Sequence, residues 1–452
     1  MSLKNYTSEF KNNLTLATPV MMGSLGHLLV GLIDDIMVGR LGPVELAATS
    51  LGNSLVFIVM SVGMGFSFAI TPLIAESDGE GNKAKGRLIF QHGLVILTIM
   101  GIVMYAFLLL IKPMMYHLDQ PEEVVKLAVP YFDIVAISMI PLMIFQGFKQ
   151  FTDGLSQTKY AMYATILTNV VNVVLNFMLI YGFWIFPRLE IVGAAIGTLI
   201  SRIVMLVFIY VVLSKKEKFS IYLKRLHITE FKNKIFKKIM SLGFPTAFQM
   251  LFEVGLFTAS VLLAGTLGAF PQAANQIALK LASTTFMVAV GVGVAATVRV
   301  GNQKGLKNYK ELRRIAFSNF LLILCIMFTF SIGFMLLKNV LPWVFTNNEE
   351  VVQIASGLLI IAGLFQLSDG LQAVILGGLR GLQDVNVPSV ITFIAYWIIG
   401  FPVCYFLGRK LDLGTFGIWI GLLVALTSSA IMLFLRFNYL SNKLINKEHE
   451  LT

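Results

Sequence analysis

Long apolar runs separated by short polar connectors are the dominant pattern along the chain. Four of these runs, 88–111, 160–187, 315–337 and 413–435, contain no Asp, Glu, Lys or Arg. Since a helix needs about 20 apolar residues to cross the hydrocarbon core of a bilayer, each run predicts a membrane span. With glycine, proline and charge clusters as boundaries, the whole chain predicts twelve spans. They are 13–39, 47–75, 87–111, 123–150, 159–183, 191–214, 239–266, 273–302, 312–337, 350–379, 385–408 and 414–437.

The second half of the chain repeats the first. At an offset of 226 residues, about half of the 452, similar residues come into register along both halves. The matched pairs are Pro19 with Pro245, Gly39 with Gly265, Gly42 with Gly268, Gly79 with Gly305, and Asn82 with Asn308. Because six spans is an even number, both copies start on the same side of the membrane, which makes the repeats parallel and related by a pseudo-twofold axis along the membrane normal.

This repeat predicts the domain organisation. We expect an N-lobe over 1–214, a basic cytoplasmic linker over 215–238 and a C-lobe over 239–452. Small-residue pairs recur in the two copies as Gly193/Gly197 and Gly417/Gly421, and such pairs let helix backbones approach closely. The predicted fold class is therefore an all-α membrane protein with two parallel six-helix bundles.

Composition agrees with this prediction and narrows the partners. Hydrophobic residues make up 57% of the chain and charged residues 13%, and the mean hydropathy is +0.80. The formal net charge of +11 could indicate nucleic acid, but the Lys and Arg residues fall between apolar runs, so we expect a lipid bilayer and no nucleic acid. Basic residues concentrate in connectors on the side of the N-terminus, which predicts a multi-pass inner-membrane protein with both termini cytoplasmic.

Polar residues inside the first half suggest an ion site. A buried charge costs a few kcal/mol in a membrane, about 2.5–3.5 by insertion scales, so an intramembrane acid indicates function. His27 and Asp34 lie two helical turns apart and share a helix face, whereas Asp35 points about 100° away, so at most one aspartate should face the same cavity as His27. Opposite them, Asn172 and Asn176 belong to a stripe of amides in the fifth span that could complete a cation or proton site.

Two acids in the second half have an amide one turn away. Gln249 precedes Glu253, and Gln366 precedes Asp369. A poorly hydrated carboxyl group can carry a proton, and the same oxygens suit Na⁺, so we expect Na⁺ or H⁺ at Glu253 and Asp369. Lys280 is a candidate counter-ion for either acid.

Aromatic and methionine side chains of the spans, Tyr396 among them, could line an adaptable apolar pocket. The residues expected to line a substrate cleft are His27, Gln249, Lys280, Gln366 and Tyr396.

Three segments resemble the multidrug and toxic compound extrusion (MATE) family, in particular its NorM-type branch. The first is Val30–Gly39 (VGLIDDIMVG) with Leu46-Ala47-Ala48. The second is Leu242–Pro245 (LGFP) with Phe252-Glu253 and Val298–Gly301 (VRVG). The third is Asp369 with Gly378–Gly381 (GLRG) and Tyr396-Trp397. The likeness runs over nearly the whole chain, in the family's order.

The resemblance implies two lobes around a V-shaped central cleft and a multidrug efflux antiporter that exports cationic amphipathic compounds in exchange for Na⁺ or H⁺. The family's cation-linked positions carry over onto Asp34, Asn172 and Asn176 in the first half and onto Glu253 and Asp369 in the second. We expect a monomer without a cofactor, and not an enzyme. Two residues depart from the family's pattern: Phe365, where some relatives have a tyrosine, and Lys280. With these departures, the resemblance does not decide between Na⁺ and H⁺ as the coupling ion.

Other functions make different demands on the sequence. A lipid-linked sugar or metabolite flippase of the same superfamily would favour a cationic cleft for pyrophosphate, whereas the charges at mid-depth are mainly acidic. A membrane prenyl transferase would need a spaced acidic cluster for Mg²⁺, whereas the adjacent Asp34 and Asp35 point to different faces of their helix. A twofold repeat with acids on both halves fits a rocking carrier better than it fits a channel.

Overall fold

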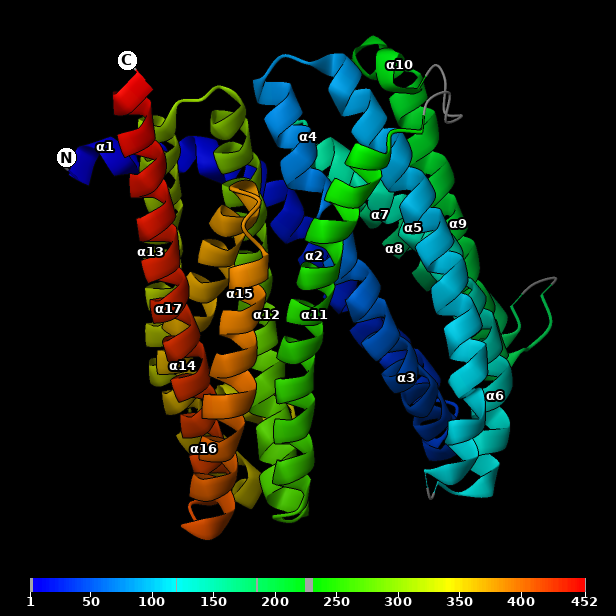
Figure 1. Ribbon diagram of the computed structural model, residues 1–452. Coiled ribbons are helices and arrows are strands. Elements are labelled where there is room, and N and C mark those ends of the chain that lie inside the picture. Colours follow the sequence, from blue (N-terminus) through cyan, green and yellow to red (C-terminus); the bar gives the residue numbers. More distant parts are fainter. Residues whose placement is uncertain (1–2, 119, 184–185, 224–230, 452) are drawn as a thin grey trace. The chain divides into compact units, whose positions relative to one another are not determined.

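The computed structural model describes residues 3–118, 120–183, 186–223 and 231–451, and these residues form helices joined by short connectors (Figure 1). Twelve helical segments among them are long and apolar enough to cross a membrane, which confirms the predicted number of spans. Several segments begin earlier or end later than predicted, as in Asn5–Gly39 and Ala269–Gly305, because the helices continue into the residues that flank the apolar runs.

The chain forms two compact units. Met22–Ala247 make up the N-unit, and Met1–Met21 together with Phe248–Thr452 make up the C-unit. The units therefore differ from the predicted lobes 1–214 and 239–452. The reason is that two helices, α2 (Phe10–Gly39) and α11 (Asn233–Gly265), begin in one unit and continue in the other. Each changes unit two residues after a proline inside the helix, Pro19 or Pro245.

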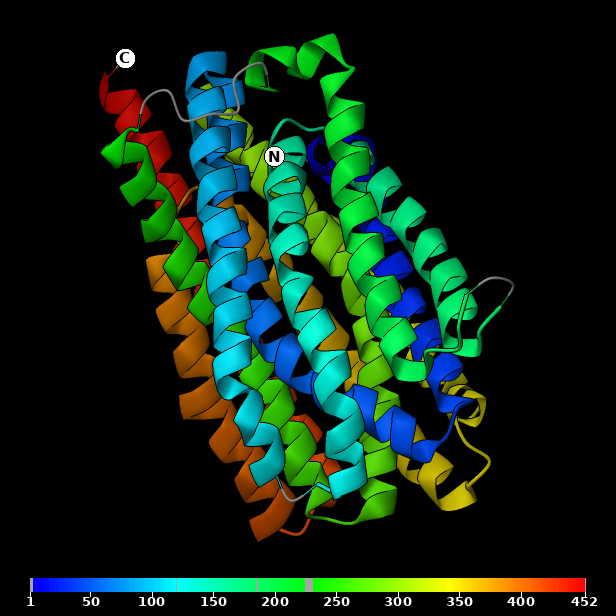
Figure 2. The ribbon, with the colours of Figure 1, turned by 90° about the vertical axis from the view of Figure 1, so that its right-hand side faces the viewer.

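The helices of the N-unit run alongside one another in both views (Figures 1 and 2). Two of its spans are interrupted: the second at Phe68 and Ala69, and the fourth at Ser138. The helices wholly within this unit are α3 (Pro43–Ser67), α4 (Ile70–Gly79), α5 (Lys83–Ile111), α6 (Glu122–Ile137), α7 (Met139–Gly154), α8 (Lys159–Tyr181), α9 (Glu190–Ser214) and α10 (Glu217–Leu223).

The C-unit has its core between α12, α14 and α17, which pack against one another. Its eleventh span is irregular, because two π-helical turns, Ile394–Gly400 and Phe406–Lys410, flank the short helix α16 (Phe401–Tyr405). The remaining helices of this unit are α1 (Leu3–Thr7), α12 (Ala269–Gly305), α13 (Tyr309–Leu337), α14 (Glu349–Gly381), α15 (Asn386–Phe393) and α17 (Gly414–Leu451).

Residues matched in the sequence repeat perform the same task in both units. Asn82 caps α5 by accepting a hydrogen bond from the Lys85 backbone N–H at 2.9 Å, and its counterpart Asn308 caps α13 by accepting one from Glu311 at 3.2 Å. An asparagine side chain satisfies a backbone donor that the first turn of a helix leaves without a partner. The repeat therefore reproduces helix starts as well as helix number.

The two glycine pairs also have equivalent roles. A Cβ atom at Gly193 would lie 2.6 Å from the Leu179 carbonyl oxygen on α8, and one at Gly421 would lie 2.5 Å from the Cys404 backbone nitrogen on α16. Only a residue without a side chain permits such contact between backbones. Close helix approach was the predicted use of these pairs, and the geometry confirms it.

The start of α2 is held within the C-unit by a cluster of charged and polar side chains. Glu9, which is 9% exposed, accepts hydrogen bonds from Arg299 at 2.7 Å and from Arg314 at 2.8 Å. Asn13, fully buried, accepts from Arg299 and donates to the Ser318 hydroxyl at 3.1 Å. Arg299, a basic residue inside the predicted span 273–302, is therefore paired with Glu9, the acid that directly precedes α2.

Replacement of Glu9 by alanine should destabilise the protein by about 2–3 kcal/mol, because two arginines lose a carboxylate that is shielded from water. Thermal unfolding of the purified full chain in detergent measures this loss. The matched control is Glu122→Ala, since its ion pair with Lys126 has side chains 81% and 70% exposed and should contribute less than about 1 kcal/mol. Equal melting temperatures for the two variants would show that the cluster does not hold the N-terminal segment.

The predicted linker 215–238 is in part a packed helix. Within it, α10 buries Phe219 and Tyr222, whose rings contact Phe151 of α7 at centroid distances of 6.1 and 5.1 Å. Further along, the Lys232 backbone N–H donates to Nε2 of His92 at 3.0 Å. The segment 224–230 lies outside the described residues.

Candidate functional site

Asp34 of α2 is the centre of the N-unit site. Its carboxylate accepts a hydrogen bond from the Asn176 side-chain amide on α8 at 2.7 Å. The Asn172 amide also faces this carboxylate, and with its nitrogen turned toward Asp34 it donates at 3.0 and 3.2 Å. Asn172 is 5% exposed and Asn176 is fully buried. The structure thus brings together the three residues that the sequence placed in one site.

Small residues allow α2, α8 and α9 to meet at this site. Asn169 precedes Asn172 by three residues and belongs to the same stripe of amides on α8. A Cβ atom at Gly26 would lie 2.8 Å from its side-chain nitrogen, so this amide lies against α2. A Cβ atom at Gly197 would collide with the side-chain amide oxygen (Oδ1) of Asn176. Gly197 therefore has a second consequence beyond helix packing, because it leaves room for the amide that holds Asp34.

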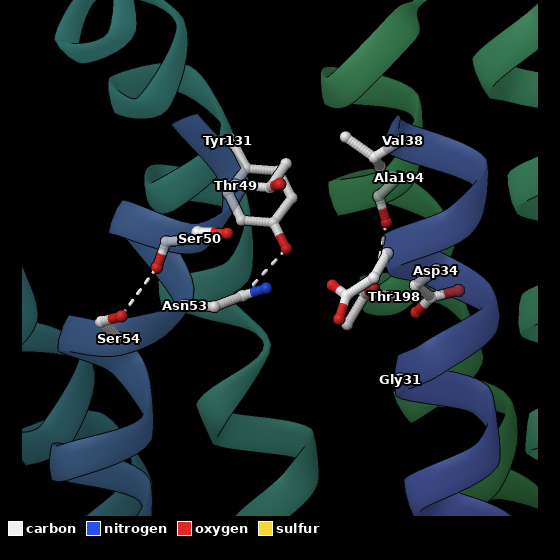
Figure 3. Close-up of a pocket in the computed structure, with 11 residues that line it drawn as sticks. Gly31, Asp34, Val38, Thr49, Ser50, Asn53, Ser54, Tyr131, Ala194 and Thr198 are labelled. Atoms are coloured by element: carbon white, nitrogen blue, oxygen red, sulfur yellow. Dashed lines mark hydrogen bonds between the residues drawn. The ribbon is translucent and has the colours of Figure 1, made fainter. Parts of the chain in front are cut away.

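The carboxylates open into a polar cavity of about 390 Å³ within the N-unit (Figure 3). Both aspartates line it, whereas His27 is exposed on α2 and is not part of the lining. The side chains of Asp34 and Asp35 point about 100° apart, but the cavity is wide enough that both line it. The lining comprises Gly31, Asp34, Asp35 and Val38 of α2, Thr49, Ser50, Asn53 and Ser54 of α3, Tyr131 of α6, and Ala194 and Thr198 of α9.

Several residues of this cavity were missed by the sequence interpretation. Tyr131 donates to the Asn53 side-chain oxygen at 2.9 Å, and both lie across the cavity from the segment of α2 that carries Asp34 (Figure 3). Ser50, Asn53 and Ser54 follow helical i, i+3, i+4 spacing inside an apolar span. This polar face was the available signal, whereas Tyr131 carries none because tyrosine is common in membrane helices.

The C-unit brings its two acids into one electrostatic cluster. Asp369 of α14 is 3% exposed, and Glu253 of α11 is half-buried. The charge of Glu253 interacts with Asp369, and also with Arg380 near the end of α14. Arg380 in turn donates a hydrogen bond to the Gln249 side-chain oxygen at 2.7 Å. The sequence missed Arg380 because it follows the last residue of the predicted span 350–379.

Lys280 does not have the predicted role of counter-ion. It is exposed on α12, and among the described residues no carboxylate lies within ion-pair distance of it. Arg380 is the basic residue beside Glu253. Phe365 is 1% exposed and packs edge-on against Phe257 and Trp419, so this position supplies the cluster with an apolar wall.

Buried polar atoms around Asp369 lack hydrogen-bond partners within the part of the chain that the structure describes. Gln366 accepts from Thr285 at 2.7 Å, but its amide nitrogen has no partner there. The Tyr396 hydroxyl lies near the side chains of Ser429 and Gln372, and the side-chain oxygen atoms of all three have no partner in that part of the chain. Such atoms are costly in a core and are typical of a place that a ligand or water completes.

The two sites have the chemistry of cation binding. Carboxylate, amide and hydroxyl oxygens are ligands that Na⁺ accepts, and a carboxylate shielded from water can take a proton instead. Among the described residues no group of three or more His, Cys, Asp or Glu side chains could hold a metal ion. A cation bound in either unit would take its further oxygen ligands from side chains such as Asn, Gln, Tyr or Thr, from backbone carbonyls or from water.

Twelve candidate spans, an internal repeat and acids shielded within both units are typical of a multi-pass membrane carrier. A family profile described as MatE matches residues 19–178 and 245–406. The chain therefore belongs to the MATE family.

Individual relatives agree with this assignment. The chain is 32% identical to "Probable multidrug resistance protein NorM" of Rhizobium meliloti, covering 96% of this chain and 94% of the relative. It is 30% identical to "Multidrug resistance protein NorM" of Vibrio cholerae, covering 98% of each. Among solved structures, the outward-facing conformation of a multidrug resistance MATE family transporter matches with a TM-score of 0.89 at 21% identity over 98% of both chains. These findings place the chain in the NorM-type branch and confirm the fold.

Proposed function

We propose that this protein is an antiporter that exports cationic amphipathic compounds, drugs or toxins, in exchange for Na⁺ or H⁺. The observation that carries the proposal is the Asp34 carboxylate, which two amides hold at the wall of a polar cavity. A carboxylate in such a place attracts either an inorganic cation or the charged group of a substrate. Relatives named multidrug resistance proteins support drug-like compounds as the cargo.

Coupling follows from competition at the carboxylates. An ion can drive a carrier between two conformations only if its affinity for them differs. Asp34 with Asn172 and Asn176 forms one ion site in this proposal, and Glu253 with Asp369 forms the other. Gln249, Gln366 and Tyr396 surround the second site, while His27 and Lys280 remain candidates for contact with substrate from their exposed positions.

The proposal also includes a location. We infer a multi-pass protein of the cytoplasmic (inner) membrane with both termini in the cytoplasm, because basic residues gather in the connectors on that side. The proposal takes the protein to be a monomer.

Efflux from proteoliposomes tests the proposed function. The purified chain is reconstituted with a fluorescent cationic dye inside the vesicles, and a Na⁺ or an H⁺ gradient is imposed separately. We expect dye release under one of the two inward gradients and only slow leakage without a gradient. Vesicles without protein and vesicles treated with an ionophore are the controls. Release that is independent of both gradients would contradict antiport.

A further inference from the structure

A second concave site of the N-unit is an apolar groove between the last turn of α2 and the last turns of α8. Its volume is about 480 Å³, which lies within the range of about 300–1,000 Å³ that is typical of ligand pockets. Met37 and Arg40 line it from the α2 side. The groove shares no lining residue with the polar cavity around Asp34, so it is a separate site.

One face of α8 forms most of the groove. Its lining residues are spaced i, i+1, i+4, i+5 and i+8, which places them on a single helix face. They are Val173, Val174, Phe177, Met178 and Tyr181. Asn172 and Asn176 each precede one of these residues, so their amides point about 100° away, toward Asp34. The helix therefore presents an amide stripe to the carboxylate and an apolar face to the groove.

The outer end of the groove is held in place by contacts between its own residues. The Tyr181 hydroxyl donates to the Met37 backbone carbonyl at 2.8 Å and joins the ends of α8 and α2. Gly182 follows with a φ of 73°, a left-handed conformation that turns the chain and that glycine adopts without strain. After this turn the Phe183 ring lies against Phe177, with a centroid distance of 5.7 Å. Aromatic rings thus form the wall at this end.

Arg40 is the charged residue of the lining. It directly follows α2 and is exposed, and among the described residues its guanidinium has neither an ion pair nor a hydrogen bond. A guanidinium binds a phosphate group with two parallel hydrogen bonds. Because Arg40 lies where a span ends, its donors are at the depth of the lipid headgroups, directly beside an apolar groove.

The length of the groove matches one leaflet of a bilayer. From Tyr181 to Val173 the lining covers eight residues of α8, about 12 Å along the helix axis. One leaflet contributes about 15 Å of hydrocarbon. A ligand that fits both features has an anionic group at one end and an apolar chain of this length at the other.

We propose that this groove binds an anionic phospholipid, with its phosphate at Arg40 and one acyl chain along the apolar face of α8. Such a lipid would contact both helices and brace α2 about one turn beyond Asp34, since Met37 follows Asp34 by three residues. The inference goes beyond the proposed export function and does not depend on it.

Native mass spectrometry of the purified full chain tests the inference, with lipids titrated into the detergent micelles. The probes are phosphatidylglycerol, which is anionic, and phosphatidylcholine with the same acyl chains, which is zwitterionic. We expect the first phosphatidylglycerol to bind about tenfold more tightly than the first phosphatidylcholine. Arg40→Gln should remove this preference by weakening only the anionic lipid. The control Arg188→Gln should keep the preference, because Arg188 is 61% exposed and already paired with Glu190.

A second substitution tests the groove itself. Val174→Trp places an indole ring among the lining residues at an exposed position and should weaken phosphatidylglycerol binding about tenfold. The matched control is Leu110→Trp, which adds the same ring at a 77% exposed position near the end of α5, outside the groove, and should change binding by less than about twofold. Glycerol phosphate carries the phosphate without acyl chains and should bind far more weakly than the lipid.

Four results would overturn the inference. Equal affinity for the two lipids in the wild type, or an unchanged preference in Arg40→Gln, would remove the arginine as a phosphate site. Unchanged phosphatidylglycerol binding by Val174→Trp would place the lipid elsewhere, and glycerol phosphate binding as tightly as the lipid would mean that the occupant is a soluble phosphate. All of these measurements are made without an ion gradient, so their failure would leave the antiport proposal untouched.

Discussion

Asp34→Asn is expected to reduce gradient-driven dye efflux by about 100-fold, the largest functional loss of any single substitution considered. The asparagine keeps the size of the side chain and can still bond to Asn176, but it carries no charge and takes up no proton. Losing one partner of a shielded charge interaction costs about 2–5 kcal/mol, and a 100-fold loss of efflux rate falls within that range of free energy. Efflux under the imposed ion gradient, normalised to the amount of reconstituted protein, measures the effect.

Asp133→Asn is the matched control for this substitution. Asp133 also lies in a span of the N-unit, but its carboxylate is paired with Lys112 at 2.7 Å and does not line the polar cavity. We expect it to retain most of the coupled efflux. If Asp34→Asn and Asp133→Asn transported equally well, Asp34 would not be the coupling group.

Asp369→Asn should cause the second largest loss, about 10- to 100-fold in coupled efflux. This carboxylate is 3% exposed, interacts with Glu253, and lies among buried polar atoms without partners in the described part of the chain. A neutral amide cannot exchange one cation for another there. The readout is the dependence of efflux on the concentration of the coupling ion, which should flatten in the variant.

A control within the same unit is Asp384→Asn. Asp384 follows α14 and pairs with Arg436 at 2.8 Å, so its loss removes a half-buried ion pair without touching the cluster around Asp369. Full ion-dependent efflux by Asp369→Asn would restrict coupling to the N-unit and remove the C-unit from the mechanism.

The sequence predicted those features that depend on local patterns. Apolar runs predicted twelve spans, and the glycine and asparagine series predicted a repeat whose members, such as Asn82 and Asn308, have equivalent roles. The helical spacing of Asn172 and Asn176 placed both amides against Asp34. Each inference needed only the period of a helix and the cost of a polar group in a membrane.

Features that depend on contacts distant in the sequence could not be predicted. Nothing in residues 1–21 indicates that they pack with the C-unit, because Glu9 and Arg299 are 290 positions apart. Similarly, Lys280 and Arg380 are both basic residues of the second half, and only the folded chain places Arg380 beside Glu253. Charge indicates that a partner is needed, but the packing of helices decides which one is present.

The two halves also differ in their chemistry despite the shared scaffold. At the repeat offset, Asp34 corresponds to Ser260, whose hydroxyl bonds to the Phe257 backbone carbonyl, and Glu253 corresponds to His27, which is exposed. Each unit therefore builds an acidic site from its own residues. The two sites need separate variants, since neither can be inferred from the other.

The most direct test of the central claim, that ion and substrate compete for Asp34, is equilibrium binding of a permanently charged cationic dye to the purified protein at increasing Na⁺ and, separately, increasing H⁺ concentration. Linkage requires that an ion sharing the site lowers dye affinity and that the dye lowers ion affinity equally. We predict displacement of the dye by one of the two ions in the wild type, and a dye affinity independent of that ion in Asp34→Asn. Dye affinity unchanged by both ions in the wild type would contradict the account.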